Sequence, residues 1–146
     1  MIPTRQDLIL QEYNTFSETL TWTENGTAVD LTSGTAIMQC RLKYGGSQVF
    51  ALSSQALTAS GSSLILGGTA GTIDVNITDS DAVGIPLSQY DILVTLANGN
   101  QETPFYGDFY MNFTCGARYL QLAYSVGVGG WVKCSSVGAY VDAHGA

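Results

Sequence analysis

The stretch that decides the fold runs from Phe16 to Arg41 and reads FSETLTWTENGTAVDLTSGTAIMQCR. In its first half Phe16, Leu20 and Trp22 share one side of an extended chain, and small polar residues occupy the other side. Alternation with a period of two is typical of a strand with one buried and one solvent-exposed face. The Asn-Gly pair at 25–26 can adopt the positive φ angles of a tight hairpin turn. The stretch therefore predicts an antiparallel hairpin.

The second half of this stretch repeats the alternation and extends it past Arg41. The residues expected to face inward are Ala36, Met38, Cys40, Leu42 and Tyr44, and those expected to face outward are Gln39, Arg41 and Lys43. Further strands are predicted at 48–52, 63–66, 72–78, 90–96 and 105–113 because each run alternates and is bounded by glycine, asparagine or serine. Residues 79–86 predict a single helical turn, capped by Thr78 or Asp79 and ended by Gly84 and Pro86.

Seven or eight short strands separated by turns favour an all-β fold, an immunoglobulin-like antiparallel β-sandwich. A small barrel remains the alternative, because the pattern does not separate the two. We expect residues 1–114 to form the sandwich. We expect these side chains to pack between its sheets: Phe16, Leu20, Trp22, Met38, Cys40, Ile73, Val75, Ile77, Ile92, Val94, Phe109 and Met111.

The composition excludes some classes of partner. Of the 146 residues only 12% are charged, about half the usual ~25%, and five basic residues leave a net charge of −7. A nucleic-acid partner needs a stripe of lysine and arginine, so none is expected. No apolar run reaches the ~20 residues that span a bilayer, and the N-terminus lacks the pattern of a signal peptide. We expect a soluble protein without a membrane partner or a cleaved leader.

Residues that bear catalytic or metal-binding chemistry form no complete motif. Asp74, Asp79 and Asp81 with Asn76 suggest calcium, but the spacing of a calcium-binding loop is absent. His144 is the single histidine, which argues against a zinc site. We therefore expect no metal and no cofactor.

Two other groups of residues have weak chemical interpretations. Glu12, Glu18 and Glu24 offer carboxylates for glycoside hydrolysis, although a sheet edge or an interface contact explains the inward-facing Glu18 more simply. No nucleophile elbow or phosphate loop occurs, so no catalytic residue is expected. Of the three cysteines, Cys40 fits a buried strand position, and a Cys115–Cys134 disulfide stays open.

Aromatic residues on the solvent side of strands suggest a binding surface. They are Tyr106 and Tyr110, in the last strand of the sandwich, and Tyr119, Tyr124, Trp131 and Tyr140 beyond it. Tyrosine and tryptophan are enriched at protein interfaces, and they also stack on sugar rings. We predict a subunit interface, with a sugar-binding platform as one alternative and internal cover of the second sheet as another.

The pattern changes at Cys115. Residues 115–146 are predicted to form a C-terminal strand or hairpin extension that docks onto a partner, because aromatic residues lie among flexible glycines there. The alternative is that residues 119–125 add an edge strand to the sandwich itself.

Several runs resemble a known family. The runs are the strand at 16–22, Val29-Asp30-Leu31-Thr32 with residues 35–41, residues 64–78 with Ile85-Pro86, and the hairpin of residues 90–109 with its Asn98-Gly99 turn. Together they resemble small tailed-bacteriophage virion proteins with an immunoglobulin-like domain, of the baseplate-upper or tail-fibre-adaptor type, over about residues 12 to 113. The segment from Cys115 departs from this pattern, which leaves the place in the particle open.

The resemblance implies a non-enzymatic structural protein of the phage particle. Its location would be the tail region, in the baseplate, tail tip or fibre attachment, after synthesis in the host cytoplasm. Its partners would be other tail, baseplate or fibre proteins and copies of itself. The alternatives are a carbohydrate-binding module for a host surface glycan and a capsid decoration protein.

Overall fold

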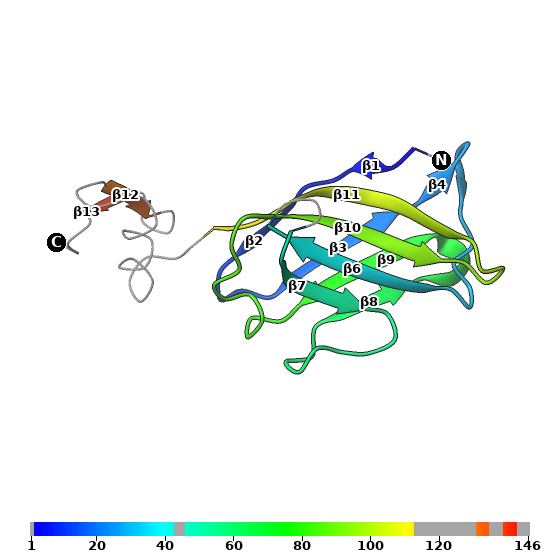
Figure 1. The fold of residues 1–146 in the computed structure, drawn as a ribbon, viewed down its shortest axis with the longest axis horizontal. Coiled ribbons are helices and arrows are strands. Elements are labelled where there is room, and N and C mark those ends of the chain that lie inside the picture. The colour runs from blue at the N-terminus through cyan, green and yellow to red at the C-terminus, as the bar shows by residue number, and fades with distance from the viewer. Residues whose placement is uncertain (1, 43–45, 113–130, 135–138, 143–146) are drawn as a thin grey trace.

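The computed structural model describes residues 2–42, 46–112, 131–134 and 139–142, and its first 112 residues form two facing β-sheets (Figure 1). The large sheet has the strand order β1-β11-β10-β6-β7, and β2 also pairs with β11. Its strands are β1 (Thr4–Arg5), β2 (Leu8–Gln11), β6 (Thr35–Arg41), β7 (Gln48–Ser53), β10 (Ser88–Thr95) and β11 (Gln101–Asn112). The small sheet has the order β3-β9-β8, with β3 (Phe16–Thr21), β8 (Ser63–Leu66) and β9 (Thr72–Ile77).

The expected all-β, sandwich-like fold is confirmed. Within the described ranges no hydrogen-bonded ladder joins the two sheets, as in a sandwich and unlike a closed barrel. Every residue expected in the core belongs to one buried cluster, with Phe16 partly buried at its margin. The cluster also contains Leu8, Leu10, Leu31, Leu52, Leu64, Tyr90 and Phe105. The rings of Phe50 and Phe109 stack at a centroid distance of 5.9 Å.

The predicted hairpin exists but is short. Asn25 and Gly26 have φ angles of 53° and 78°, as expected, and they join β4 (Thr23–Glu24) to β5 (Thr27–Ala28). The longer strands on either side do not pair with each other, because β3 pairs with β9 and β6 pairs with β10 and β7. Residues 29–34 carry the chain from one sheet to the other, with the Leu31 N–H bonded to the Gly68 carbonyl at 2.9 Å.

One local prediction was wrong and another is confirmed. Leu42 is 52% exposed because β6 ends at Arg41 and the Leu42 N–H turns to the Ser47 carbonyl. The single turn predicted at 79–86 is present: the Ala82 N–H reaches the Thr78 carbonyl at 3.0 Å, the Thr78 hydroxyl accepts a hydrogen bond from the Asp81 N–H at 3.4 Å, and Gly84 follows with a φ of 66°. The predicted positions of Lys43, Tyr44 and Phe113 lie outside the described residues.

An N-terminal strand was missed. β1 and β2 run parallel to β11 along its free edge, with Thr4 opposite Phe105 and Leu8 opposite Phe109. Leu8 and Leu10 are buried and Ile9 between them is 47% exposed, so the alternation is present in the sequence. Parallel pairing with residues about a hundred positions away leaves no local trace, which is why the pattern was overlooked.

Beyond residue 112 the structure describes one hairpin, made of β12 (Trp131–Cys134) and β13 (Ala139–Asp142). A hairpin is one of the two forms expected for the extension, but it lies later in the chain than the alternating run at 119–125, which is outside the described residues. In the described ranges no helix is long and apolar enough to cross a bilayer.

Asp81 anchors the connection between β7 and β8 to the turn after β9. Its Oδ2 accepts hydrogen bonds from the hydroxyls of Thr58 and Ser62, each at 2.5 Å. Burial is the largest single influence and raises the pKa of Asp81, but hydroxyl donors from Ser62, Thr58 and Ser60 together hold that pKa below its usual value. The ionised carboxylate therefore stabilises the fold.

Replacing Asp81→Asn should lower the free energy of unfolding by about 1–2 kcal/mol at neutral pH, because charge-assisted hydrogen bonds are lost. The native pKa lies below the unfolded one, so the contribution is complete above the unfolded pKa and is lost as the pH falls through the folded pKa. Urea unfolding at several pH values measures this. Asp79→Asn, at an exposed neighbour, is the control. An equal acid dependence in wild type and Asp81→Asn would contradict the assignment.

Candidate protein-protein interface

Two of the six predicted interface residues are placed by the structure on the outer face of the large sheet. Tyr106 and Tyr110 are partly buried residues of β11, and their inward-facing neighbours Phe105, Phe109 and Met111 enter the core. Register places Tyr110 opposite Ile9 on β2 and Tyr106 opposite Arg5 on β1.

The side chains of the other four predicted residues lie outside what the structure describes. Tyr119 and Tyr124 lie outside the described residues. Trp131 and Tyr140 are in β12 and β13, where the backbone pairs Trp131 with Asp142 and Lys133 with Tyr140. Their role at an interface stays a prediction.

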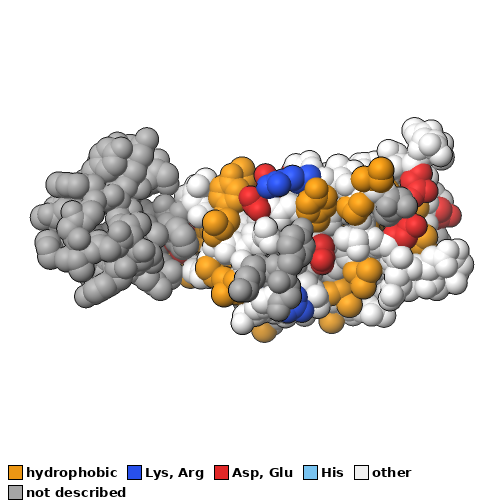
Figure 2. Space-filling model, turned by 45° about the horizontal axis from the view of Figure 1, so that its top comes forward, with side chains coloured by type: hydrophobic (Ala, Val, Ile, Leu, Met, Phe, Trp, Pro, Cys, Tyr) orange, Lys and Arg blue, Asp and Glu red, His pale blue; other side chains and the backbone are white. Residues whose placement is uncertain are grey.

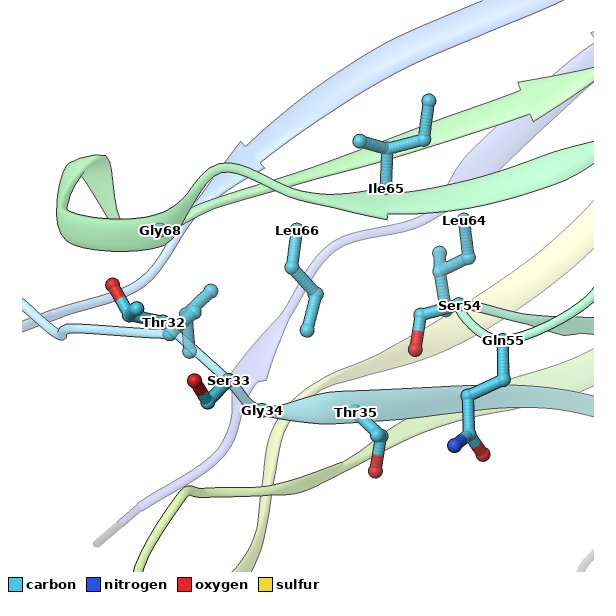
Figure 3. A pocket seen from close by; sticks show the side chains of 11 residues that line it. Thr32, Ser33, Gly34, Thr35, Ser54, Gln55, Leu64, Ile65, Leu66 and Gly68 are labelled. Atoms are coloured by element: carbon cyan, nitrogen blue, oxygen red, sulfur yellow. The ribbon is translucent and has the colours of Figure 1, made fainter.

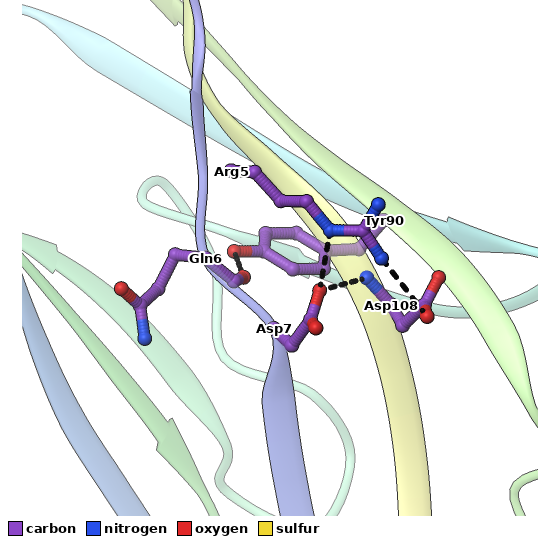
Figure 4. A network of polar contacts seen from close by, with 5 residues as sticks. All are labelled: Arg5, Gln6, Asp7, Tyr90 and Asp108. Atoms are coloured by element: carbon purple, nitrogen blue, oxygen red, sulfur yellow. Dashed lines mark hydrogen bonds and ion pairs between the residues drawn. The ribbon is translucent and has the colours of Figure 1, made fainter.

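The N-terminal strand is fixed beside Tyr106 by a set of polar contacts (Figure 4). Asp7 Oδ1 accepts a hydrogen bond from the Asp108 N–H at 2.9 Å and lies 3.2 Å from Arg5 Nε. Arg5 Nη2 lies 3.1 Å from Asp108 Oδ2. Tyr90, whose side chain is buried in the core, donates its hydroxyl hydrogen to the Gln6 carbonyl. Side chains and backbone together therefore hold the break between β1 and β2 against β11.

These contacts shift the ionisation of the groups that make them. The Asp108 N–H holds the pKa of Asp7 below its usual value, and Arg5 adds to this. The Asp7 carboxylate in turn raises the pKa of Arg5, with Asp108 contributing. Burial raises the pKa of the Tyr90 phenol, and the carboxylates of Glu18 and Asp7 raise it further. Tyr90 is therefore neutral and can donate its hydrogen bond at physiological pH.

Exposed apolar side chains gather on the same outer face. Ile37 on β6 is 43% exposed and lies opposite Leu93 on β10, which is 37% exposed. Leu87, immediately before β10, is 66% exposed and is adjacent in register to Tyr110. Figure 2 shows a face on which hydrophobic side chains form several separate patches among charged ones.

The outer face of the small sheet is different in character. Ser17 donates to Asn76 at 2.9 Å and Thr19 donates to Asp74 at 2.7 Å, so these side chains satisfy one another across β3 and β9. Ile65 on β8 is 51% exposed. This is the pattern of a solvated face, whereas the large sheet carries the aromatic and aliphatic groups typical of an interface.

A groove of about 450 Å³ opens between the start of β6 and strand β8 (Figure 3). Leu64 and Leu66 project into it (Figure 3), Leu31 also lines it, and serine, threonine and glutamine side chains supply its polar groups. None of the residues that line it is titratable, so the groove offers no acid, base or nucleophile pair for catalysis.

A second hollow of about 450 Å³ lies beside the β4–β5 hairpin and is lined by Trp22, Glu24 and Glu102 among others. The carboxylates considered for glycoside hydrolysis are not brought together: Glu12 follows β2 and Glu24 is in β4, at opposite ends of the sandwich (Figure 1). Glu18 is partly buried in β3 between them.

Two of the three carboxylates considered for calcium accept hydrogen bonds from hydroxyls, and the third, Asp79, is exposed. Asp74 bonds Thr19 on one sheet face, and Asp81 bonds Thr58 and Ser62 at the end of that sheet. In the described ranges no three acidic, histidine or cysteine side chains group together as metal ligands. The sulfur of Cys40 is buried and free, and burial raises the pKa of its thiol, as a structural role requires.

Sequence reasoning missed several residues of this surface. Arg5, Ile9 and the partner residues Leu93 and Ile37 were not singled out, although the alternation of Ile9 with Leu8 and Leu10 was available. Neither a family model nor a curated protein matches the chain. The surface is therefore interpreted from its own geometry.

Proposed function

We propose that the protein is a non-enzymatic structural component of a tailed-phage particle, in the baseplate, tail tip or fibre-attachment region, which acts by protein-protein assembly. The observation that carries the proposal is the outer face of the large sheet. Tyr106, Tyr110, Leu87, Leu93 and Ile37 lie there in neighbouring strands, whereas the groove between β6 and β8 is lined by no titratable group. A sandwich that exposes apolar and aromatic side chains on one face, and whose described residues form no recognised catalytic group, suits assembly better than catalysis.

The immunoglobulin-like assignment is part of this proposal. Naming the strands after the variable-type immunoglobulin fold, β3-β9-β8 would correspond to B-E-D and β11-β10-β6-β7 to G-F-C-C′. β1 and β2 would together correspond to the first strand of that fold, which here pairs in parallel with β11, the counterpart of strand G. This correspondence, together with the phage-like runs in the sequence, favours a domain of the baseplate-upper or fibre-adaptor type.

The proposed partners are copies of the same chain and neighbouring tail, baseplate or fibre proteins. Nucleic acid and membrane are not among them, since a net charge of −7 opposes binding to phosphates. Virion components commonly act in rings or trimers, so we expect several copies per particle. Immunogold labelling of intact particles tests the location: label on the tail supports the proposal, and label on the head favours a capsid decoration protein.

The extension at 115–146 is proposed as the docking element. Truncation after Thr114 should leave the sandwich folded, because its core is complete by Met111, and should prevent incorporation into particles. Circular dichroism and thermal melting report folding, and complementation of a particle lacking the protein reports incorporation. If the truncated chain unfolds or aggregates instead, the extension belongs to the fold. Unchanged incorporation would also contradict the docking role.

The carbohydrate alternative has a separate test. On a glycan array, specific micromolar binding that disappears with Trp131→Ala would overturn the purely structural function. Tyr106→Ala is the matched comparison, because it removes an aromatic ring from the sandwich rather than from the extension.

A further inference from the structure

The outer face of the large sheet is organised in rows that cross its strands. One end row contains Ile9, Tyr110 and Leu87, and the other contains Leu93 and Ile37. From Leu87 to Leu93 the two apolar rows lie about 20 Å apart, at ~3.3 Å per residue.

Two polar rows lie between the apolar ends. The first contains Asp108, Gln89, Arg41 and Gln48 in register, and the second contains Tyr106, Asp91, Gln39 and Ala51. The face therefore has the sequence apolar, polar, polar, apolar along its strands. Such a pattern is complementary to itself when it is reversed end to end.

The charges distinguish this face from the remaining surface. Within residues 2–42 and 46–112 the basic residues are Arg5 and Arg41, and both belong to strands of the large sheet. Carboxylates elsewhere, such as Glu24, Asp30 and Asp79, have no basic neighbour in the described part of the chain. A partner as acidic as this chain would be repelled over most of the surface and least here.

We propose that this face binds a second copy of the same chain, with the two large sheets packed face to face about a two-fold axis that lies between them and perpendicular to the strands. The axis places the Tyr110 row of one copy on the Leu93 row of the other. It also places Arg41 of each copy opposite Gln39 of the other copy. The Asp91 of that other copy lies one strand away from this Arg41. The same two contacts then occur twice, as an isologous interface requires.

The hydrogen-bonding capacity of the central rows fits this arrangement. Arg41 donates to the Gly46 carbonyl at 2.9 Å and to Gln39 at 3.2 Å, which uses two of its five N–H groups. Asp108 of one copy faces Tyr106 of the other, where the phenol can donate to the carboxylate. We expect association in the micromolar range, because the apolar groups lie in two separate end rows with polar rows between them.

Sedimentation velocity of the full chain over a concentration series tests the proposal. The wild type should shift from 15.5 kDa toward twice that mass. Leu93→Asp, which places a charge in an apolar row, should weaken association at least tenfold. Ile65→Asp, a comparably exposed position on the small sheet, should leave it unchanged.

A charge-reversal pair tests the geometry itself. Arg41→Glu and Asp91→Arg should each reduce self-association, because like charges then face each other across the axis. An equimolar mixture of the two variants should recover it, since each copy supplies the charge that the other needs. Circular dichroism shows whether each variant is folded, and the mixture remains informative when a single variant loses association by partial unfolding, because such a variant would not recover.

Three results would overturn the inference. They are a monomer at every concentration, a dimer insensitive to Leu93→Asp, and charge variants that are folded by circular dichroism but fail to recover association on mixing. The proposed dimer is one way in which the proposed assembly function would be carried out, so the inference rests on that function. The two can nevertheless fail separately. A monomer in solution would refute this surface, while particle labelling would still decide the location.

Discussion

Trp22→Ala should lower the free energy of unfolding by about 3–5 kcal/mol, as expected when a large aromatic side chain is removed from a packed core. Trp22 is 3% exposed and belongs to the cluster between the sheets, with Leu20 and Ile73. Small domains are stable by about 5–15 kcal/mol, so this change would remove a large part of the margin. Urea unfolding followed by circular dichroism measures it.

Two further variants separate packing from hydrogen bonding at this position. The indole Nε1 of Trp22 is buried and has no hydrogen-bond partner within the described residues. Trp22→Phe therefore gives up no hydrogen bond there and should cost clearly less than Trp22→Ala. Thr21→Ala, at the exposed neighbouring position, is the control. Wild-type stability of Trp22→Ala would mean that the indole lies outside the core.

Gly107→Ala should displace the N-terminal strand from β11. A Cβ at this position would lie 2.7 Å from the Gln6 carbonyl oxygen and 2.8 Å from Asp7 Oδ1, closer than real Cβ contacts. The chain must then separate or strain, at a cost of about 1–3 kcal/mol typical of overpacking. Hydrogen exchange should show lost protection in residues 4–11 with the remaining strands retained. The Tyr90 hydroxyl would lose its acceptor, so Tyr90 fluorescence or titration gives a second signal.

Gly99→Ala provides the comparison for this glycine. A Cβ at Gly99 meets nothing within 4 Å, but its φ of +88° is unfavourable for alanine. Its cost should be about 1 kcal/mol, without any change in protection of residues 4–11. Protection of those residues that survives Gly107→Ala would show that the N-terminal strand can move aside without detaching.

The predictable part of the fold is the part whose pattern is local. The strands around Leu20, Met38, Val75 and Ile92 alternate strongly, and their inward residues all lie in the core. The Asn25-Gly26 turn was also identified correctly, because its positive φ angles are a property of those residues alone. The pairing of the strands could not be predicted in the same way, because no local signal in the sequence indicates that β3 and β6 lie in different sheets.

The candidate interface was partly predictable. Tyr106 and Tyr110 could be placed on the outer side of β11 by alternation with Phe105 and Phe109. Their neighbours Arg5 and Ile9 come from the other end of the chain, so the composition of the surface depends on pairing that the sequence does not display. Glu12 shows the same limit: it is fully buried and accepts a hydrogen bond from the Gly84 N–H, 72 residues away.

The parallel pairing of the N-terminal strand with β11 has a consequence for synthesis on the ribosome. Asp7 and Asp108 contact each other across 101 positions, so the first strand emerges long before the strand that receives it. Until residue 112 has left the exit tunnel, Leu8 and Leu10 lack the strand that holds them against the core. Contacts of such long range close late and slowly. The nascent chain should therefore be a client of holding chaperones until the final strand of the sandwich is released.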